Sequence, residues 1–521
     1  MRPFLHRFVS LMLCIFCLIP WIPSASAQED PELRQAEAIY GFDVLTKSEN
    51  IAVDSLFDGD ILNPGSTWDE AYFTLTRQEG LGSLYIIFHK AYGEYEVTNE
   101  DTGEIAIVGK TGYLHDFLDL EALFGTCPKS VTVRFASGAA HIVEVYVYTP
   151  GIVPEHVQRW EEPKDGQTDL ILFSAHADDE HLFFAGILPY YGAELGCQVQ
   201  VVYLTNHPNF LSLRIHELLN GLWAVGIRTY PVIGQFPDIN LPTIWETYGY
   251  FQGLGHPKED IQAFILEQIR RFKPKVVVTH DFYGEYGHGM HMVMADMVSN
   301  GVAIANDPEQ FPESAEKYGT WDVPKTYIHL YKENPIILDW DQPLGAFDGM
   351  TAFQVSIKRG FAAHVSQRDD FWWFHSDKEF ARDLPRYNPC FYGLYRSTVG
   401  PDTEKNDFFE NLTTYEQDRQ AAEALLAEQE RLRAEEEARN QAEADALRQA
   451  EEAEKQKAEA QKQAEAESQA ARQEEEAEKQ NALARQEKRT QLLIAAVSFV
   501  FLVILVLFFR YSRRKNYPEN F

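Results

Sequence analysis

Cysteine is scarce in this sequence, with 5 among 521 residues. Cys14 and Cys17 lie in an apolar N-terminal run, which leaves Cys127, Cys197 and Cys390 for the rest of the chain. Such an odd, sparse set excludes a disulfide scaffold, and these last three form no Cys-x-x-Cys pair of the kind that holds structural zinc. At most one disulfide bridge is open to them, so we expect the fold to rest mainly on its hydrophobic core.

Positive charge is also in short supply. The chain has 46 Lys and Arg residues against 79 Asp and Glu residues, and its formal net charge is −33. A strongly acidic protein repels phosphate backbones, which argues against nucleic acid and other polyanionic partners. The charge does not choose among neutral sugars, cationic ligands and peptides.

Residues 416–490 contain no glycine, no proline and no aromatic residue. They are mostly Ala, Glu, Gln, Lys and Arg, which are strong helix formers, so they predict a charged helical stalk supported by i,i+4 ion pairs. Its leucines are too sparse for a sustained heptad seam: Leu425, Leu426, Leu432, Leu447 and Leu483. A coiled-coil homodimer with Ala at the core positions and a disordered tether are the alternatives.

An apolar run near the N-terminus predicts a signal peptide. Arg2 and Arg7 precede the run at 8–22, and the small residues at 25–27 provide a cleavage site. This order of features is typical of secretion, so we expect residues 1–27 to be removed after export. A retained N-terminal anchor is the alternative.

A second apolar run, at 492–509, carries no charge. At about 1.5 Å per residue it nearly spans a hydrocarbon core, which predicts a transmembrane helix. Basic residues follow it directly: Arg510, Arg513, Arg514 and Lys515. The positive-inside rule then places the tail at 510–521 in the cytoplasm and the rest outside, as a single-pass cell-membrane protein held to the membrane by its C-terminal helix.

Residues 30–150 have the pattern of short strands separated by turns. The segments at 83–89, 104–108, 130–135 and 142–148 are rich in β-branched and aromatic residues, and some alternate apolar with polar positions. This spacing predicts a β-sandwich domain. It contains no metal or nucleophile motif, so a carbohydrate-binding module and a plain structural domain both stay open.

Residues 165–400 change to alternating strands and helices. The expected strands lie at 169–175, 199–205, 230–233 and 275–280, and the expected helices at 211–225 and 259–272. Strands that alternate with helices of 10–15 residues predict the α/β class, here a Rossmann-like doubly wound parallel sheet. Ligands bind such sheets beyond the carboxyl ends of the strands.

The first of these strands ends in a dense polar cluster. His176 and Ala177 precede three consecutive acidic residues and then His181. Like charges at a strand end repel one another, and a bound cation removes the repulsion. His176 and Asp179, three apart across the turn, can both point at one ion, while Asp178 between them stays free to act as a base. A solvated acidic turn is the alternative.

A second cluster follows the strand that ends at His280. His288 and His291 are three residues apart, so at a helix start they share a face. One of them can bind a metal while the other faces the substrate. Two unrelated surface histidines are the alternative, but the position at the end of a second strand of the same predicted sheet favours a joint site.

The His-x-Asp-Asp-Glu block at 176–180 and the Gly-His-x-x-His block at 287–291 together resemble the PIG-L (LmbE-like) deacetylase family. The resemblance covers roughly residues 168–300, and we expect the PIG-L-like deacetylase domain to extend over residues 165–400. Members are typically zinc-dependent and remove N-acetyl groups from glucosamine-containing substrates. Ala177 stands where relatives usually have Pro, and Gly289-Met290 where many have Pro-Asp.

The resemblance implies a role for each residue of the two blocks. His176, Asp179 and His291 become the ligands of one Zn²⁺ per chain, which leaves a coordination position for water, as in catalytic zinc sites. Asp178 becomes the general base. His288 stabilises the tetrahedral intermediate or protonates the leaving amine, which leaves poorly unless it is protonated.

Arg214 and Asp238 are weaker candidates for substrate binding. Relatives often have an Arg-x-x-Glu pair where this chain has Arg214 and Glu217. Arg214 then hydrogen-bonds substrate hydroxyls or an anionic group with Glu217 orienting it, or the two form an exposed ion pair. Asp238 follows another strand and either binds sugar hydroxyls or caps a turn.

The expected function is removal of N-acetyl groups from an N-acetylated amino sugar in an extracellular glycan or glycoconjugate. Two alternatives stay open. One is a zinc-dependent hydrolase that cleaves an amide or ester in a non-sugar substrate. The other is a surface glycan-binding protein whose metal site is vestigial.

Overall fold

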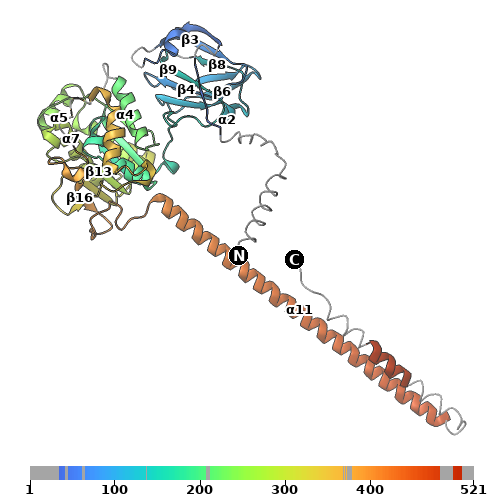
Figure 1. Cartoon of the computed structure of the whole chain (residues 1–521). Helices are drawn as coiled ribbons and strands as arrows, with labels where there is room; N and C mark the ends of the chain where they lie inside the picture. The colour runs from blue at the N-terminus through green and yellow to red at the C-terminus, as the bar shows by residue number, and fades with distance from the viewer. Residues whose placement is uncertain are drawn as a thin grey trace, which may run out of the picture. The chain divides into compact units, whose positions relative to one another are not determined.

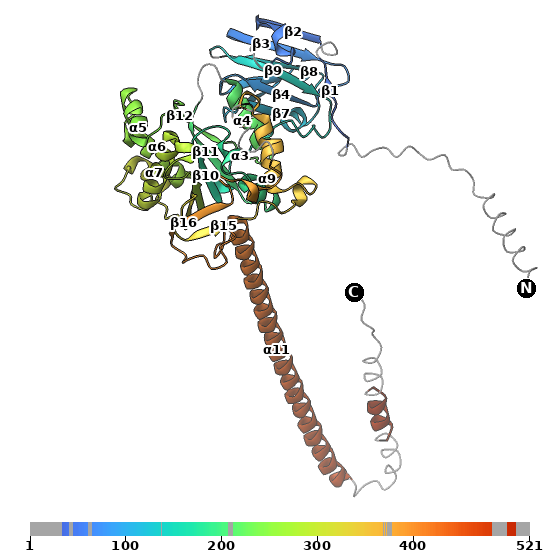
Figure 2. The same ribbon diagram turned by 60° about the vertical axis from the view of Figure 1, so that its left-hand side comes forward.

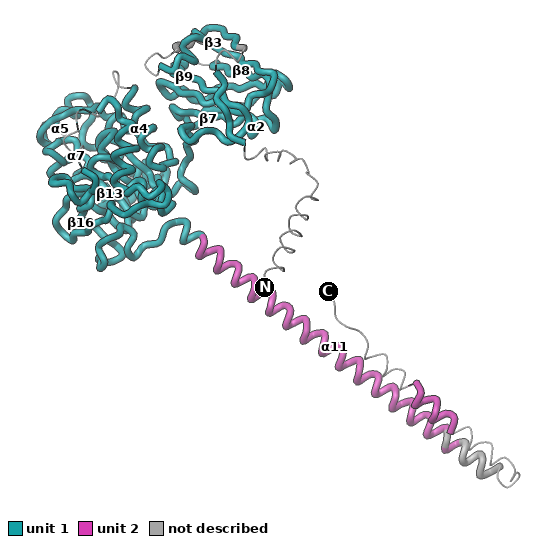
Figure 3. Tube along the Cα trace, in the orientation of Figure 1, with its two compact units in different colours: residues 1–419 teal, residues 420–521 magenta. Residues whose placement is uncertain are grey.

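The computed structural model describes residues 34–40, 45–60, 65–136, 138–206, 212–367, 369, 371, 378–481 and 497–506. Residues Met1–Arg419 form one compact unit and Gln420–Phe521 a second (Figure 3). The predicted signal peptide at 1–27 and the predicted tail at 510–521 lie outside the described residues. The division at about 150–165 into two domains stays a prediction.

The N-terminal part of the first unit is built from antiparallel strands (Figure 1). Within the described ranges they join into a nine-stranded sheet in the order β6-β5-β8-β3-β9-β4-β7, with β1 on β9 and β2 on β3. The strands are β1 (Ala38–Ile39), β2 (Leu45–Ile51), β3 (Gly65–Thr76), β4 (Ser83–Phe88), β5 (Tyr95–Asn99), β6 (Glu104–Val108), β7 (His115–Asp119), β8 (Ser130–Phe135) and β9 (His141–Tyr148). A short helix, α2 (Leu120–Phe124), follows β7.

The four strands expected at 83–89, 104–108, 130–135 and 142–148 are all present as β4, β6, β8 and β9. The long strand β3 connects the sheet, because its first residues pair with β9 and its later residues pair with β8. Alternate residues of β5 are buried, as period-two side chains require. The sandwich arrangement itself stays a prediction.

The second part of the first unit is an α/β arrangement around a seven-stranded sheet in the order β12-β11-β10-β13-β14-β16-β15. Its strands are β10 (Leu170–Ser174), β11 (Val199–Thr205), β12 (Val232–Phe236), β13 (Val276–Thr279), β14 (Lys325–His329), β15 (Pro335–Ile337) and β16 (Phe391–Ser397). The mixed α/β class is therefore confirmed. The two interior strands with continuous apolar sequence, β10 and β11, are buried along their whole length.

The sheet is not parallel throughout, which corrects the prediction. The five strands from β12 to β14 are parallel, but β16 runs antiparallel to both β14 and β15. A parallel neighbour needs a long crossover connection, usually a helix. The alternation of strand and long helix that predicted a parallel sheet ends at β14, and short helical turns dominate the chain between β15 and β16.

Helices cover both faces of this sheet (Figure 2). Leu170 and Leu172 of β10 pack into one core cluster with α4 (Ser212–Ala224), whereas Ile171 and Phe173 pack into a second cluster with α6 (Lys258–Phe272) and α7 (Gly289–Ile304). Successive strand residues thus enter opposite layers. The helices are α3 (Asp179–Leu182), α4 (Ser212–Ala224), α5 (Ile244–Gly253), α6 (Lys258–Phe272), α7 (Gly289–Ile304), α8 (Pro312–Tyr318) and α9 (Ala352–Val355).

The predicted stalk is helical where it is described. Helix α11 (Tyr415–Asn481) has 67 residues, or about 100 Å at 1.5 Å per residue. Ion pairs along it join Arg431 to Glu428 and Glu435 at i,i+3 and i,i+4 spacing. Leu425 and Leu447 are exposed. A homodimer through this helix stays a prediction.

The structure corrects the prediction of a membrane helix at 492–509. The part of the chain that the structure describes holds no helix with both the length and the apolar character to cross a membrane. The prediction of a single-pass membrane protein, with the chain held at the membrane by this helix, is therefore wrong.

Candidate metal centre and active site

The first segment of the site is the turn between β10 and α3. His176 and Asp178 lie in this turn, and α3 begins at Asp179. Asp178 is only 2% exposed and has a φ of 116°, a backbone conformation that L residues rarely adopt. Its backbone N–H donates to Glu180 Oε2 at 2.8 Å, which holds the turn. Strained backbone of this kind persists where surrounding contacts fix it, and it clusters at functional sites.

The second segment runs from β13 to α7. His280 follows β13 directly, and a 3-10 turn, η6 (Glu285–Gly287), lies between it and α7. His288 is the residue at the N-terminal cap of α7, and His291 lies in the first turn of the helix. Since β10 and β13 are parallel neighbours, their carboxyl ends meet at one edge of the sheet. The two sequence blocks therefore come together, as expected.

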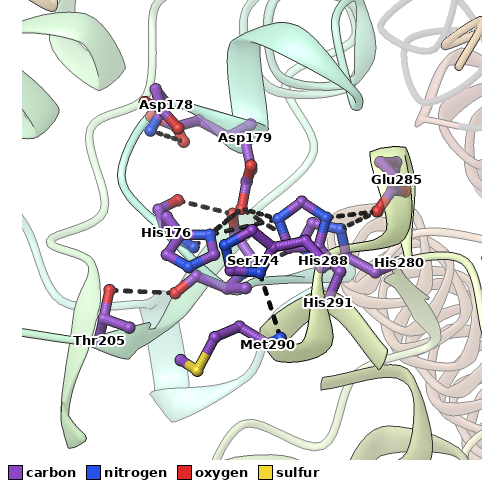
Figure 4. A network of polar contacts seen from close by, with 12 residues as sticks. Ser174, His176, Asp178, Asp179, Thr205, His280, Glu285, His288, Met290 and His291 are labelled. Carbon is purple, nitrogen blue, oxygen red and sulfur yellow. Dashed lines mark hydrogen bonds and ion pairs between the residues drawn. The ribbon is translucent and has the colours of Figure 1, made fainter. Parts of the chain in front are cut away.

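Three ligand atoms of the predicted set converge in the interior (Figure 4). His176 Nδ1 lies 3.0 Å from Asp179 Oδ2, and His291 Nε2 lies 3.2 Å from His176 Nδ1. His291 Nε2 is also 3.3 Å from Asp179 Oδ2. All three residues are at least nine-tenths buried. Each corner of this triangle is an atom of a type that binds zinc.

The triangle has the dimensions of one face of a tetrahedral zinc site. Zinc binds imidazole nitrogen and carboxylate oxygen at about 2.0–2.2 Å, which places two ligands of a tetrahedron about 3.3–3.5 Å apart. The three measured edges, 3.0, 3.2 and 3.3 Å, approach this value. Without a cation, the buried His291 would gain a proton, because Asp179 and Glu285 outweigh the effect of burial and raise its pKa to about 10. The residues therefore fit a divalent cation in place of that proton.

His280 and His288 also lie near this position but are committed elsewhere. The groups whose ligand atoms lie within 4.8 Å of one another include His176 with His288 and His291, and Asp179 with His280 and His291. The lone pair of His280 Nε2 accepts the backbone N–H of Ala175 at 3.0 Å, so it cannot also bind an ion. Backbone contact thus removes His280 from the ligand set.

His288 uses its other nitrogen in the same way. Its Nδ1 accepts the backbone N–H of Met290 at 3.2 Å, so the neutral ring carries its proton on Nε2. Burial, followed by the neighbouring His176 and His291, lowers the pKa of His288 to about 2. The ring is therefore neutral near neutral pH, and its Nε2–H is a hydrogen-bond donor rather than a ligand.

Glu285 accepts hydrogen bonds from three histidines around the site, a role that the sequence pattern did not predict. Its carboxylate accepts from His291 Nδ1 at 2.7 Å, from His280 Nδ1 at 2.8 Å and from His329 Nδ1 at 2.6 Å. The other nitrogen of His329 faces the carbonyl of Asn388 at 3.1 Å, so both ring nitrogens face acceptor oxygens. Burial alone would raise the pKa of Glu285, but the three histidines outweigh it and hold the pKa well below its usual value.

A carboxylate behind a ligating histidine fixes the tautomer and orientation of the ring. Glu285 does this for His291, because its carboxylate accepts the hydrogen bond from Nδ1–H and thereby directs Nε2 toward Asp179. The only sequence signal was an acidic residue six positions before His291. Its role depends on β13, β14 and α7 meeting, which the sequence pattern does not state.

Arg214 holds Asp178 in place. Its guanidinium donates to Asp178 Oδ2 at 3.1 Å, to the carbonyl of Ala177 at 2.6 Å and to Asp238 Oδ2 at 3.4 Å. Burial raises the pKa of Asp178 well above its usual value, Arg214 opposes the rise, and Asp179 adds to it. These surroundings therefore favour the protonated form of the Asp178 carboxyl group more than water does.

Arg214 and Asp238 both contact residues of the metal site, Asp178 and His176 respectively. Arg214 is 6% exposed, so the alternative of an exposed ion pair with Glu217 is wrong. Glu217 instead accepts the backbone N–H of Ser366 at 2.7 Å and its hydroxyl at 2.6 Å. Asp238 Oδ1 lies 3.4 Å from His176 Nε2, on the side of the ring away from the ligand triangle. Substrate binding by Arg214 and Asp238 stays a prediction.

Gly289 sets the approach of α7 to the site and gives a first prediction. A Cβ at this position would lie 2.2 Å from Thr247 Oγ1 and 2.7 Å from the carbonyl oxygens of Leu241 and Thr243. Gly289→Ala must therefore displace the helix start that carries His288 and His291. We expect the free energy of unfolding to fall by about 1–3 kcal/mol and zinc affinity to weaken, measured by denaturant unfolding and by zinc titration.

Gly249→Ala is the matched control, since this glycine is also helical but has open space where its Cβ would lie. We expect it to leave both quantities unchanged or to stabilise the helix slightly. Equal effects of the two variants would contradict the steric explanation.

Comparison with known families gives the class of the second half of the first unit. Residues 171–302 match the family model described as PIG-L: GlcNAc-PI de-N-acetylase. The match begins in β10 and ends in α7, so it contains both sequence blocks. The chain therefore carries a PIG-L domain, and the resemblance drawn from the two blocks is confirmed. This family consists of deacetylase enzymes.

Several of the matching curated relatives are named for one reaction. The 1D-myo-inositol 2-acetamido-2-deoxy-alpha-D-glucopyranoside deacetylase 1 of Catenulispora acidiphila is 25% identical over 182 residues, 30% of this chain and 54% of the relative. The Mycobacterium leprae enzyme of that type is 26% identical over 239 residues, 40% of this chain and 71% of the relative. Deacetylase 2 of Saccharopolyspora erythraea is 37% identical over 173 residues, 30% and 61% of the two chains. This chain thus spans about half the length of the first of these relatives.

Among solved structures, the N,N'-diacetylchitobiose deacetylase from Pyrococcus horikoshii, in complex with its inhibitor MPG, has 13% sequence identity and a TM-score of 0.30. The match covers 44% of this chain and 84% of that chain. A likeness at this score carries no argument about function.

Proposed function

We propose that this protein is a zinc-dependent hydrolase that removes the N-acetyl group from an N-acetylated amino sugar in a glycan or glycoconjugate. The observation that carries the proposal is the triangle of His176 Nδ1, Asp179 Oδ2 and His291 Nε2, with Asp178 and His288 beside it. The family match and the names of the curated relatives support the reaction and the type of sugar.

His176, Asp179 and His291 would hold the cation, and Glu285 would orient His291 toward it. When bound, a zinc ion lowers the pKa of a water molecule and polarises the amide carbonyl. Two imidazoles and one carboxylate form a ligand set that leaves a position open, as catalytic zinc sites require.

Asp178 acts as the general base in this proposal. It takes a proton from the attacking water as the new bond to the acetyl carbon forms. Arg214 keeps the carboxylate oriented through its hydrogen bond to Oδ2. When the bond from carbon to nitrogen breaks, the protonated Asp178 returns the proton to the amine. Water and amide thus become acetate and a free amino sugar, and no other reactant is needed.

His288 acts on the carbonyl oxygen. Its ring is neutral and carries the proton on Nε2, so it donates a hydrogen bond to the oxygen as negative charge develops there. Proton transfer from His288 to the leaving amine is less favoured by this tautomer, because the group would have to lose its only ring proton. The surroundings of the two side chains support this division: Asp178 carries the proton from water to the amine, and His288 donates a hydrogen bond to the carbonyl oxygen.

Acetate release tests the proposal directly. The full chain, loaded with zinc, is incubated with N-acetylglucosamine and N,N'-diacetylchitobiose, and free acetate and the deacetylated sugar are measured. We expect turnover that is lost on chelation and restored by zinc. Turnover of an N-acetyl peptide or an aryl acetate in place of the sugars would support the non-sugar hydrolase instead. Sugar binding without turnover of any of these substrates would support a vestigial site.

His176→Ala separates metal binding from the rest of the fold. The substitution removes one ligand of three, so we expect the corresponding zinc equivalent and the acetate release to be lost together. Zinc content after dialysis, measured by mass spectrometry of the metal, provides the readout. His256→Ala is a control, because this half-buried histidine lies outside both sequence blocks and should leave the zinc content unchanged. Retention of zinc and of full turnover by His176→Ala would remove His176 from the site.

A further inference from the structure

A second cluster of buried ligand-type side chains lies next to the first but uses different atoms. Glu180 and His181 belong to α3, and His364 follows the 3-10 turn η9 (Phe361–Ala363). All three have 0% exposure. Glu180 Oε1 lies 3.4 Å from His181 Nε2 and 3.4 Å from His364 Nε2, and the three ligand atoms all lie within 4.8 Å of one another. We call this set the Glu180 cluster.

Most polar side-chain atoms of the Glu180 cluster make no hydrogen bond to the described residues. Neither nitrogen of His181, neither nitrogen of His364 and not Glu180 Oε1 has a hydrogen-bond partner within the described part of the chain. Native proteins satisfy nearly all of their buried polar groups, and an exception calls for an explanation such as a bound water or ion. Five atoms without a hydrogen bond among three neighbouring side chains are a larger exception than packing alone explains.

Tyr203 does not account for the missing partners. Burial and the nearby Glu180 carboxylate raise the pKa of its phenol well above the usual value, so Tyr203 is a neutral donor. A phenol donates one hydrogen bond at most, and to the carboxylate. The two imidazoles would still face each other and Glu180 without a partner.

The geometry matches a cation better than direct contact. The 3.4 Å contacts of Glu180 Oε1 with His181 Nε2 and His364 Nε2 are not directed as hydrogen bonds are. A distance of 3.4 Å does match the spacing of two ligands on a tetrahedral zinc ion, which is about 3.3–3.5 Å. Two imidazoles facing a carboxylate are the ligand chemistry of zinc-type divalent ions.

Two glycines keep this point free of side chains. A Cβ at Gly221 in α4 would lie 2.8 Å from His181 Nε2 and 3.0 Å from His364 Nε2. A Cβ at Gly360 would lie 2.4 Å from His181 Nδ1. Any larger residue at either position would block the nitrogens. The backbone therefore approaches the imidazoles closely while leaving their lone pairs uncovered by side chains.

We propose that Glu180, His181 and His364 form a second binding site for a divalent transition-metal ion of the zinc type. The site is structural in character, since it is fully buried. Glu180 Oε2 accepts the backbone N–H of the strained Asp178, so an ion on Oε1 would stiffen the turn that carries this residue. It would also tie the segment of His364 to α3.

Metal stoichiometry of the full chain tests this site. The protein is stripped with a chelator and titrated with Co²⁺ and with Zn²⁺, and bound metal is counted by native mass spectrometry and by visible absorption of the cobalt form. We expect two equivalents for the wild type and one for His364→Gln, which keeps a polar side chain but removes the imidazole ligand. His216→Gln is the control, because His216 is an equally buried histidine outside both clusters, and it should keep two.

The reciprocal variant keeps the test independent of whether His364→Gln folds. His176→Ala should still bind one equivalent, held by the Glu180 cluster. A wild-type chain that binds a single equivalent, with none left in His176→Ala, would overturn the second site and leave the proposed function intact. A single equivalent that survives His176→Ala but is lost in His364→Gln would support the second site and contradict the first.

Discussion

Asp178→Asn is expected to lower kcat for N-acetyl sugar hydrolysis by about 10³-fold while the zinc content stays unchanged, since a positioned general base contributes about 10²–10⁴-fold. The carboxylate is the only part of Asp178 that takes a proton in the proposed reaction. Asparagine tolerates positive φ better than most residues, so the strained turn should keep its shape. Acetate release and metal analysis on the same preparation provide the measurement.

The control for this variant is Asp169→Asn. Asp169 is a buried aspartate at the opposite end of the strand that leads to the site, where it accepts the backbone N–H groups of Gln198 and Tyr415. We expect its kcat to stay within about two-fold of the wild type, because an amide oxygen can keep part of those bonds. An Asp178→Asn enzyme with wild-type kcat would show that another group accepts the proton.

Glu285→Ala is expected to lower the free energy of unfolding of the metal-free protein by about 3–5 kcal/mol, the cost of breaking a buried ion pair by removing one partner. The substitution leaves three imidazoles without their common acceptor. His329 then keeps only its contact from Nε2 to the carbonyl of Asn388. Zinc affinity should also fall by about 10–100-fold, because His291 loses the group that orients it.

Tryptophan fluorescence during denaturant unfolding reports on the unit that contains Glu285, since all 9 tryptophans precede residue 420. Far-ultraviolet circular dichroism would be dominated by the long helix α11 instead. Glu259→Ala, an exposed glutamate at the start of α6, is the control and should change the free energy of unfolding by less than about 0.5 kcal/mol. A Glu285→Ala protein as stable as this control would mean that the three histidines find other partners.

Much of the α/β part could be predicted from the sequence, because its signals are local. The strands expected at 169–175, 199–205 and 275–280 appear as β10, β11 and β13, and the helix expected at 259–272 appears as α6 with nearly the same ends. Continuous apolar runs and helical periodicity are properties of a few neighbouring residues. The antiparallel strand β16 was not foreseen, because pairing across more than sixty residues leaves no mark on local periodicity.

The membrane prediction failed for a related reason. Hydropathy at 492–509 is also a local signal, and it gives the apolar character of a segment without fixing the length of a helix. Among the described residues, no helix is both long enough and apolar enough to cross a membrane. Composition alone therefore overstated what the structure provides.

The sequence by itself determined the chemistry of the site: His176 and Asp179 are three residues apart in one turn, His288 and His291 share a helix face, and each pair follows a buried strand. Only the tertiary structure decided the roles around them. Contact with the backbone of Ala175 commits the His280 lone pair, Glu285 gathers three histidines, and Arg214 pairs with Asp178 rather than Glu217. The physical reason is that hydrogen-bond partners are chosen by distance in space, and strand order, which joins residues more than one hundred positions apart, sets that distance.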